Sequence, residues 1–367
     1  MILVDFSSII HRMMHTSISQ VKPAKVDGKY ITADFVGLMK YYIFQELFAI
    51  KQEHGPNFGE IVICLDKSST GYWRKEVYPG YKARRKRDRE ESDIDFKEVF
   101  AHVDALIDQI KTNLPWRVVE VPTAEADDIM LVLAREFNGS EKILIHSPDK
   151  DMIQAQRNTD QVFQYSGLTK KWLVPENKHE HMDHWIQEHV CLGDSSDDVP
   201  KVVDHTEFTK TFIDWIGERG YNINTPMEFK AAPISNDIKR GLIEDFDIYK
   251  TDRKGESIGV KDIYKDIRFG PSTLVKAIAK AGSLDAWLDS HPLYRQNYER
   301  NFKLIMEEGI PTEIWNKIVL AYKTAETDYR DKEFEQYLTD NGLQSILLTL
   351  PGVFKITRDL TADDFGW

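Results

Sequence analysis

The sequence contains few cysteines: two among 367 residues, Cys64 and Cys191. Two thiols cannot form the disulfide framework of a small secreted protein, and Cys64 falls within an apolar run typical of a buried strand. No apolar run approaches the roughly 18 residues that a membrane-spanning helix needs. No basic region with a cleavage site precedes the first apolar run, as a signal peptide requires. We therefore expect a cytoplasmic protein with no membrane partner.

Two common catalytic motifs are also missing: the Gly-x-x-x-x-Gly-Lys-Ser/Thr loop of nucleotide-binding enzymes and the Gly-x-Ser-x-Gly turn of serine hydrolases. Four histidines and one cysteine do lie near one another along the chain: His179, His181, His184, His189 and Cys191. Their spacing matches no familiar zinc-binding pattern, and no second cysteine pair completes one. A zinc site therefore has little support.

Net positive charge is absent, because 60 acidic residues outnumber 48 Lys and Arg and the net charge is −12. Nucleic-acid affinity comes largely from Lys and Arg neutralising phosphates, so this average disfavours a nucleic-acid partner. Between residues 72 and 89, however, eight basic residues accompany only two acids, Glu76 and Asp88. The basic residues are Arg74, Lys75, Lys82, Arg84, Arg85, Lys86, Arg87 and Arg89.

Four aromatic residues are interleaved with this basic run: Tyr72, Trp73, Tyr78 and Tyr81. Basic side chains that follow phosphates, together with rings that stack on unpaired bases, are typical of proteins that bind single strands or junctions. For a charge run alone, a solvated helix face is the alternative. Lys82 and Arg74 are the candidates for contact with a scissile phosphate.

Nine acidic residues form the most informative pattern: Asp5, Asp66, Glu125, Asp127, Asp128, Asp149, Asp151, Asp194 and Asp197. Asp5, Asp66 and Asp149 each stand at the end of an apolar, strand-like run. Because a parallel sheet brings the carboxyl ends of its strands to one edge, we expect these carboxylates to converge there.

Convergent carboxylates repel one another and raise one another's pKa unless cations neutralise them, and clusters of hard oxygen ligands suit Mg²⁺ and Mn²⁺. Two Mg²⁺ ions about 3.5–4 Å apart can ionise a water and stabilise both oxygens of an in-line phosphoryl displacement. The pattern therefore indicates a divalent-metal enzyme acting on a phosphate ester. For any single aspartate, a solvated charge or a helix cap is the alternative.

Strand-like and helix-like patterns alternate over the first two hundred residues, which predicts an α/β fold with a mainly parallel central sheet flanked by helices. Beyond residue 200 helical patterns take over, at 208–216 and from 269 to 288. The expected strands cover residues 1–4, 61–65, 117–121 and 143–147, a hairpin joins 162–165 to 172–174, and helices cover 35–50, 96–110 and 125–137.

Gly270-Pro271-Ser272-Thr273 precedes a helical stretch with Lys276 and Lys280 about one turn apart. Free backbone N–H groups at a helix start, with lysines behind them, can hold a phosphate without reading base sequence. An ordinary helix that begins with proline explains the same residues equally well.

Five segments occur in an order that resembles the structure-specific 5′ nucleases: Asp5 in Leu-Val-Asp-Phe-Ser, residues 72–82, Glu125-Ala126-Asp127-Asp128, residues 147–151 and residues 193–197. That family includes flap endonucleases and the 5′-nuclease domain of bacterial DNA polymerase I. Gly71-Tyr72-Trp73-Arg74 and Arg89-Glu90-Glu91-Ser92 are most similar to its ribonuclease H branch from T-even bacteriophages, which implies a viral protein acting in a host cytoplasm. The likeness covers about residues 1–203 and 269–310.

The resemblance implies an α/β 5′-nuclease catalytic domain over residues 1–200, with a helical arch at about 72–100 over the site. It also implies a helical C-terminal DNA-binding region over residues 201–367, with a helix-three-turn-helix element that grips duplex DNA. Asp198 and Lys201 replace the Asn and Gly usual in the family, and an insertion at about 204–268 precedes that element.

The family motifs imply a role for each candidate residue. Asp5, Asp66, Glu125, Asp127 and Asp149 resemble the ligands of a first metal ion. Asp128, Asp151, Asp194 and Asp197 resemble those of a second, with Asp149 near both. Arg74 and Lys82 match the catalytic basic residues at the scissile phosphate, and Tyr81 resembles the ring on which a nucleotide stacks. The other implied nucleic-acid contacts are Arg84, Arg85, Lys86 and Arg87 of the arch, and Gly270, Ser272 and Lys276 of the helix-three-turn-helix element.

The implied reaction is hydrolysis of RNA in RNA–DNA hybrids and of 5′ DNA ends or flaps, for RNA primer removal in replication. The implied cofactors are two Mg²⁺ ions, with Mn²⁺ as a substitute, and K⁺ in the helix-three-turn-helix element. The expected partners of this monomer are branched or 5′-ended DNA and RNA–DNA hybrid. A sliding clamp or single-strand-binding protein is a further candidate partner of the tail Asp363–Trp367, for which a frayed terminus is the alternative.

Two other functions compete with this one. A phosphatase of the haloacid dehalogenase type needs a second Asp two residues after the first, and Ser7 stands there instead. A catalytically silent DNA-junction binding protein would keep the fold and lose acids from the site, so the complete acidic set argues against it.

Overall fold

The computed structural model describes residues 1–66, 71–174, 182–204, 206–224, 226–246, 269–325, 331–340 and 342–344. The chain divides into two compact units. The sheet unit comprises residues 1–76, 84–182 and those from 310 onward, and the helical unit comprises residues 77–83 and 183–309. Among the described residues, no helix combines the length and apolar character needed to cross a membrane. The predicted division of roles at residue 200 stays a prediction.

The central sheet has six strands in the order β5-β4-β1-β6-β7-β8. All neighbouring strands run parallel except β7 and β8, which form the predicted antiparallel hairpin. The α/β class and the mainly parallel sheet are therefore confirmed. The chain order reverses beside β1, and such a switch point is where open sheets place their sites. The strands are β1 (Ile2–Asp5), β4 (Ile61–Leu65), β5 (Arg117–Glu120), β6 (Ile143–His146), β7 (Val162–Ser166) and β8 (Lys171–Leu173).

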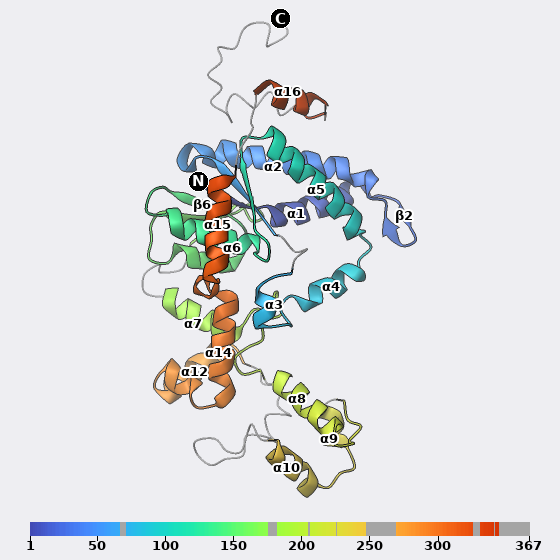
Figure 1. Ribbon diagram of the computed structural model, residues 1–367, viewed down its shortest axis with the longest axis vertical. Helices are drawn as coiled ribbons and strands as arrows, with labels where there is room; N and C mark the ends of the chain where they lie inside the picture. Colours follow the sequence, from blue (N-terminus) through green and yellow to red (C-terminus); the bar gives the residue numbers. More distant parts are fainter. Residues whose placement is uncertain are drawn as a thin grey trace, which may run out of the picture. The chain divides into compact units, whose positions relative to one another are not determined.

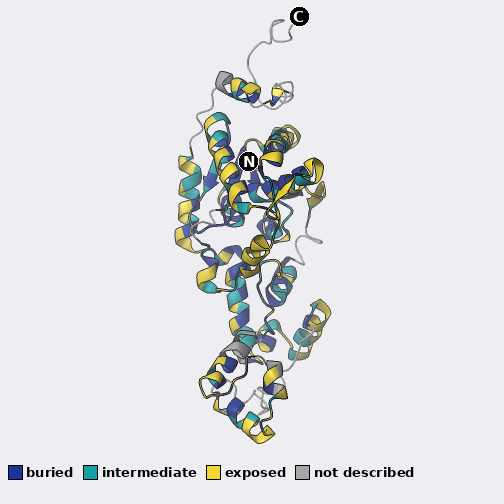
Figure 2. Cartoon of the chain, turned by 90° about the vertical axis from the view of Figure 1, so that its right-hand side faces the viewer, coloured by how far each residue is buried: buried dark blue, intermediate teal, exposed yellow. Residues whose placement is uncertain are grey.

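Helices cover both faces of the sheet (Figure 1). α1, α2 and α5 pack on one face, where Ile2 and Val4 of β1 join their apolar core. α6 contacts four of the strands and packs against α15, so it covers the other face. Buried stretches lie on the inner sides of these helices and in the strands, and exposed stretches lie on the outer sides (Figure 2). The helices are α1 (Phe6–Val21), α2 (Ala33–Phe58), α5 (Phe96–Asn113), α6 (Ala126–Phe137), α15 (Thr312–Thr324) and α16 (Asp331–Asp340), which packs against α5.

α1 and the small hairpin after it are not among the predicted elements. α1 begins where β1 ends, and the Asp5 carboxylate caps it by accepting a hydrogen bond from the Ser8 N–H at 2.9 Å. The hairpin joins β2 (Lys25–Val26) to β3 (Lys29–Tyr30) through Asp27 and Gly28, which both have positive φ. That conformation favours Asp-Gly pairs in tight hairpins, so the signal was present in the sequence.

The segment predicted to form the arch is largely helical. It contains α3 (Arg74–Val77), α4 (Ala83–Glu90) and the first turn of α5. No residue of α4 is buried, so its basic side chains are accessible to a ligand.

The named elements of the helical unit are all helical, as the pattern beyond residue 200 predicts. Phe212, Phe229 and Phe246 form a small core for α8 to α10 within the predicted insertion. A helix-three-turn-helix element is not confirmed. Residues 247–268 and the tail Asp363–Trp367 lie outside the described residues. The helices are α7 (Met182–Leu192), α8 (Thr206–Gly217), α9 (Pro226–Ala231), α10 (Asn236–Asp245), α12 (Pro271–Ala281), α13 (Leu284–Leu288), α14 (Pro292–Ile305) and the short η3 (Glu307–Gly309).

Candidate active site

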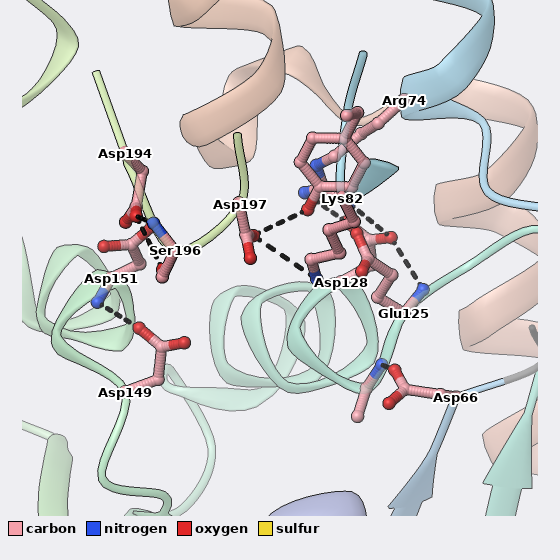
Figure 3. Close-up of polar contacts among 12 residues, drawn as sticks. Asp66, Arg74, Lys82, Glu125, Asp128, Asp149, Asp151, Asp194, Ser196 and Asp197 are labelled. Carbon is pink, nitrogen blue, oxygen red and sulfur yellow. Dashed lines mark hydrogen bonds and ion pairs between the residues drawn. The ribbon is translucent and has the colours of Figure 1, made fainter. Parts of the chain in front are cut away.

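Carboxylates gather at the carboxyl edge of the sheet. Asp5 is the last residue of β1, and Asp66 follows β4 directly. The Ser147 hydroxyl, just after β6, donates to Asp5 Oδ2 at 2.9 Å, and the Ser7 hydroxyl donates to Asp66 Oδ2 at 2.6 Å. Asp66 Oδ1 also accepts the Ala126 N–H at 2.8 Å, so it touches the first turn of α6 (Figure 3).

Cys64 of β4 is a buried thiol near these acids. Burial raises the pKa of Cys64 well above its usual value, and the negative charges of Asp5, Asp127 and Asp66 raise it further. Asp5 ends β1 and Asp66 follows the adjacent parallel strand β4, so both lie at the same edge of the sheet. The same environment keeps Cys64 in its unreactive thiol form.

The start of α6 holds a buried ion-pair network. The Arg74 guanidinium bonds Glu125 Oε2 at 2.9 Å and both oxygens of Asp128, at 3.0 and 2.7 Å. Asp128 also accepts the Trp73 indole N–H at 3.0 Å and the Glu125 backbone N–H at 2.9 Å, which closes a capping box. Exposure is 0% for Asp128 and 3% for Arg74. In this arrangement Arg74 neutralises Asp128, and the pair positions Glu125.

Asp149 and Asp151 sit in a tight turn after β6. Asp149 caps the short helix η2 (Lys150–Gln156) by accepting the Asp151 N–H at 2.8 Å. Buried Gln164 of β7 donates its amide to the carbonyls of Ser147 and Asp149, at 3.1 and 2.6 Å. The turn is thus tied to the neighbouring strand. Gln164 was not predicted as a site residue, because a lone Gln in a strand carries no distinctive signal.

Asp194 and Asp197 belong to the helical unit, where they share one loop. The Asp194 carboxylate accepts the Ser196 N–H at 2.7 Å and its hydroxyl at 2.6 Å. Gly193 has φ +66°, and a Cβ there would lie 2.4 Å from the Val199 carbonyl oxygen, so only glycine fits.

Tyr81 and Lys82 meet Asp197 within the same unit. The Tyr81 hydroxyl donates to Asp197 Oδ2 at 2.9 Å, and Lys82 Nζ lies 3.3 Å from the same oxygen (Figure 3). The Lys82 backbone N–H also donates to the Asp197 carbonyl at 2.9 Å. The sequence-predicted phosphate contact and stacking ring are therefore held beside one predicted ligand.

α14 anchors the loop that carries Asp194 and Asp197. Asn301, with 0% exposure, donates to the carbonyls of Val190 and Pro200 at 3.0 and 2.7 Å. Asn297 donates to the carbonyls of Val202 and Asp204 at 2.9 and 3.0 Å.

Arg300 orients both of these amides. It bonds the Asn297 side-chain oxygen at 3.1 Å and that of Asn301 at 3.0 Å, and its guanidinium lies 5.1 Å from the centre of the Tyr78 ring. These residues were not predicted as site residues, because polar side chains spaced three and four apart on a helix are usually solvated.

The remaining predicted contacts are on exposed surfaces. Gly270 is the N-cap of α12, and Ser272 and Lys276 are exposed on its first turns. Lys201, where the family usually has Gly, donates to the Phe269 carbonyl at 2.5 Å and so supports the start of α12. Arg84, Arg85, Lys86 and Arg87 are exposed on α4.

Only part of the predicted histidine cluster is described. His189 stacks on Trp185 with ring centres 5.0 Å apart. His179 and His181 lie outside the described residues.

Comparison with known proteins shows which family the chain belongs to. A family model for the "5′-3′ exonuclease, N-terminal resolvase-like domain" matches residues 1–188. Ribonuclease H of Enterobacteria phage T4 is 30% identical over 210 residues, 57% of this chain and 66% of the phage protein. The thermostable DNA polymerase I of Thermus aquaticus is 33% identical over 148 residues, 39% of this chain and 17% of the polymerase.

A solved structure of the zinc-bound T5 5′-exonuclease is also similar, with a TM-score of 0.46 and 15% identity over 89% of this chain and 99% of that one. The chain spans just under two thirds of the T4 ribonuclease H and about a sixth of the polymerase. The family model covers more than half of the chain and includes seven of the nine acids. The chain belongs to the 5′-3′ exonuclease family.

Proposed function

We propose that this protein is a Mg²⁺-dependent, structure-specific 5′-3′ exonuclease and flap endonuclease with ribonuclease H activity. Its substrates would be phosphodiester bonds at the 5′ ends of RNA–DNA hybrids and of DNA duplexes or flaps, and its role RNA primer removal in replication. The observation that carries the proposal is the placement of Asp5 and Asp66 at the carboxyl ends of the adjacent parallel strands β1 and β4, with Asp66 bonded to the first turn of α6, in a member of this family.

The donor set fits Mg²⁺. The candidate ligands are carboxylate oxygens, with the hydroxyls of Ser7 and Ser147 beside them, and hard oxygen donors are those that Mg²⁺ and Mn²⁺ prefer. A first ion would be held by Asp5, Asp66, Glu125, Asp127 and Asp149, and a second by Asp151, Asp194 and Asp197. Asp128 fits less well as a ligand, because Arg74 and Trp73 already engage both its oxygens. When bound, two such ions supply a water of lowered pKa and stabilise the leaving oxygen.

The chain's own residues bind and orient the substrate. Lys82 would contact the scissile phosphate. Arg74 fits the same contact less well, because it is 3% exposed and pairs with Glu125 and Asp128, and Tyr81 fits a stacking role less well, because it too is 3% exposed. Arg84, Arg85, Lys86 and Arg87 on the exposed α4 would follow the phosphates of a free 5′ end, and the start of α12 with Lys276 would grip the duplex. K⁺ would bind at the start of α12, and a sliding clamp or single-strand-binding protein would dock on the protein.

Cleavage of a 5′-labelled RNA-primed duplex and of a matched 5′-flap DNA tests the function. Short products that require Mg²⁺, disappear in EDTA and are reduced by at least about a hundredfold in Asp149→Asn support it. Asp104→Asn, which changes an exposed aspartate on α5, should cleave like the native chain. Tight binding without cleavage in Mg²⁺ or Mn²⁺ would overturn the proposal and favour a catalytically silent junction binder.

A further inference from the structure

Gln164 places a buried amide in the middle of the central sheet. It pairs with Ile145 of β6 and Leu173 of β8, and it is 1% exposed. A buried amide is costly unless its N–H groups are bonded. The side-chain nitrogen of Gln164 donates to two carbonyls, those of Ser147 at 3.1 Å and Asp149 at 2.6 Å. Both of its hydrogens are therefore directed at the turn that carries Asp149.

Ser147 connects this turn to the neighbouring strand end. Its hydroxyl, which is 0% exposed, accepts the Asp149 N–H at 3.2 Å and donates to Asp5 Oδ2 at 2.9 Å. A shift of the turn would therefore also move the hydroxyl that bonds Asp5. Gln164 thus acts on two predicted ligands, on Asp149 through its backbone and on Asp5 through Ser147.

Two further buried glutamines lie in η2, directly after this turn. Gln154 donates its amide to the Asp151 carbonyl at 2.9 Å, and Gln156 donates to the Leu173 carbonyl of β8 at 2.8 Å. Gln156 is 4% exposed, so it is nearly as buried as Gln164. Because its partner is in β8 and not in the turn, Gln156 provides a matched comparison for Gln164.

The kind of donor matters for a site that receives a cation. Arg74 holds Glu125 and Asp128 with a positive charge, whereas the turn at Asp149 is held by a neutral amide. A cationic donor in place of Gln164 would repel an incoming metal ion. The amide fixes the turn without that repulsion, so the support it gives does not weaken cation binding.

We propose that Gln164 and Ser147 are positioning residues that fix Asp149 and Asp5 in place for a divalent cation. The inference rests on the proposed function, since it names the residues that orient the ligands of that same site. Both residues act through the ligands. Partners that orient metal ligands are worth about 10–100-fold in metal affinity or activity when they are removed.

Two pairs of variants separate this role from a general contribution to stability. Gln164→Met keeps an unbranched side chain of similar length and removes both donors, and Gln156→Met makes the same change at the contact with β8. Ser147→Ala removes the connecting hydroxyl. Its control is Ser166→Ala, at a buried hydroxyl that accepts the Thr169 N–H at 3.2 Å. All four variants lose a buried hydrogen bond, so thermal unfolding alone does not separate them.

Isothermal calorimetry with Mn²⁺, in the absence of substrate, measures the effect on the ligands. Gln164→Met and Ser147→Ala should each weaken Mn²⁺ binding by about tenfold, while Gln156→Met and Ser166→Ala keep the native affinity. In cleavage of the RNA-primed duplex, Gln164→Met should need about tenfold more Mg²⁺ for half its maximal rate. Native Mn²⁺ affinity in Gln164→Met, or an equal loss in Gln156→Met, would overturn the proposal.

Hydrogen exchange in EDTA gives a readout that needs no metal. The Asp151 N–H donates to Asp149 Oδ1 at 2.8 Å, and the Met152 N–H donates to the Asp149 carbonyl at 3.3 Å (Figure 3 shows the first of these). Exchange at both amides should be faster in Gln164→Met than in Gln156→Met, because the turn opens more often. Equal exchange in the two variants would contradict a role of Gln164 in fixing the turn.

These measurements keep the inference apart from the proposed function. If the native chain binds Mn²⁺ but cuts no substrate, the proposed function fails, and the Mn²⁺ titration still decides the role of Gln164. If Gln164→Met does not fold, the comparison of Ser147→Ala with Ser166→Ala decides: weaker Mn²⁺ binding by Ser147→Ala alone supports the proposal, and equal binding by the two overturns it.

Discussion

The Arg74 guanidinium balances the negative charges of two buried carboxylates, those of Glu125 and Asp128. Replacing it by Met would remove the guanidinium that pairs with buried Glu125 and Asp128, and removing one partner of a buried pair costs about 3–5 kcal/mol. We expect Arg74→Met to lose about that much free energy of unfolding in urea. Arg84→Met on the exposed α4 should change it by less than about 0.5 kcal/mol. An unchanged urea midpoint for Arg74→Met would show that the ion pairs of Arg74 with Glu125 and Asp128 do not stabilise the folded chain.

His146 makes the stability of the sheet unit depend on pH. Burial, more than any neighbouring charge, lowers the pKa of His146 from 6.5 to about 4. The unfolded chain therefore binds more protons than the folded one between pH 6.5 and 4, and stability is lost as the pH falls through that window. The loss at pH 5 is about 2 kcal/mol for this one group.

Urea unfolding at pH 7 and pH 5 measures this effect, and His146→Gln should reduce the difference between the two midpoints. Nearby His54 also has a pKa lowered by burial, so part of the acid sensitivity should persist in the variant. An equal difference in the variant and the native protein would assign the acid sensitivity to other groups.

At the scale of single elements, α14 acts as the support of the Asp194 loop. In Asn301→Ala, the buried carbonyls of Val190 and Pro200 lose their donor, at a cost of about 1–3 kcal/mol. Hydrogen exchange at the Val199 and Val202 amides should accelerate, because the loop opens more often. Gln296→Ala, an exposed position on the same helix, should leave exchange unchanged. Faster exchange throughout the helical unit would mean a general loss of stability instead.

The elements themselves were predictable to different degrees. The apolar runs that became β1, β4 and β6 also located Asp5 and Asp66, since a parallel strand presents its last residue at the sheet edge. α1 was not predicted, although Asp5 caps it. An aspartate at the end of a strand suits a metal ligand and a helix N-cap equally well, and here Asp5 is the N-cap. Asn297 and Asn301 could not be identified, because their partners are backbone carbonyls that only the folded loop brings within reach.

At the scale of the whole molecule, the nine predicted ligands are divided between the two units. Seven belong to the sheet unit, and Asp194 and Asp197 belong to the helical unit with Tyr81 and Lys82. The family motifs predicted the order of these residues along the chain, whereas the division could not be seen from order alone. Tyr81 and Lys82 belong to the helical unit because residues 77–83 pack with the loop that carries Asp197, more than a hundred positions later.

Divalent ions should stabilise the folded chain, because only the folded state brings the acidic ligands together to bind them. Binding to the native state alone adds about 2.7 kcal/mol when the ion is at about 100 times its Kd. We expect Mg²⁺ to raise the melting temperature, EDTA to reverse the rise and Asp5→Asn to reduce it. The Asp104→Asn variant should respond like the native chain. A melting temperature that is the same with and without Mg²⁺ or Mn²⁺ would contradict ion binding by the nine predicted ligands.

The most direct test of the central claim is the polarity of cleavage. One RNA-primed duplex is labelled at the 5′ end of the primer strand in one sample and at the 3′ end in another, and both are followed with time in Mg²⁺. The account predicts that 5′ label leaves first as short 5′-phosphorylated products while the 3′-labelled strand shortens gradually. Release from the 3′ end, or tight binding with no cleavage in either sample, would contradict it.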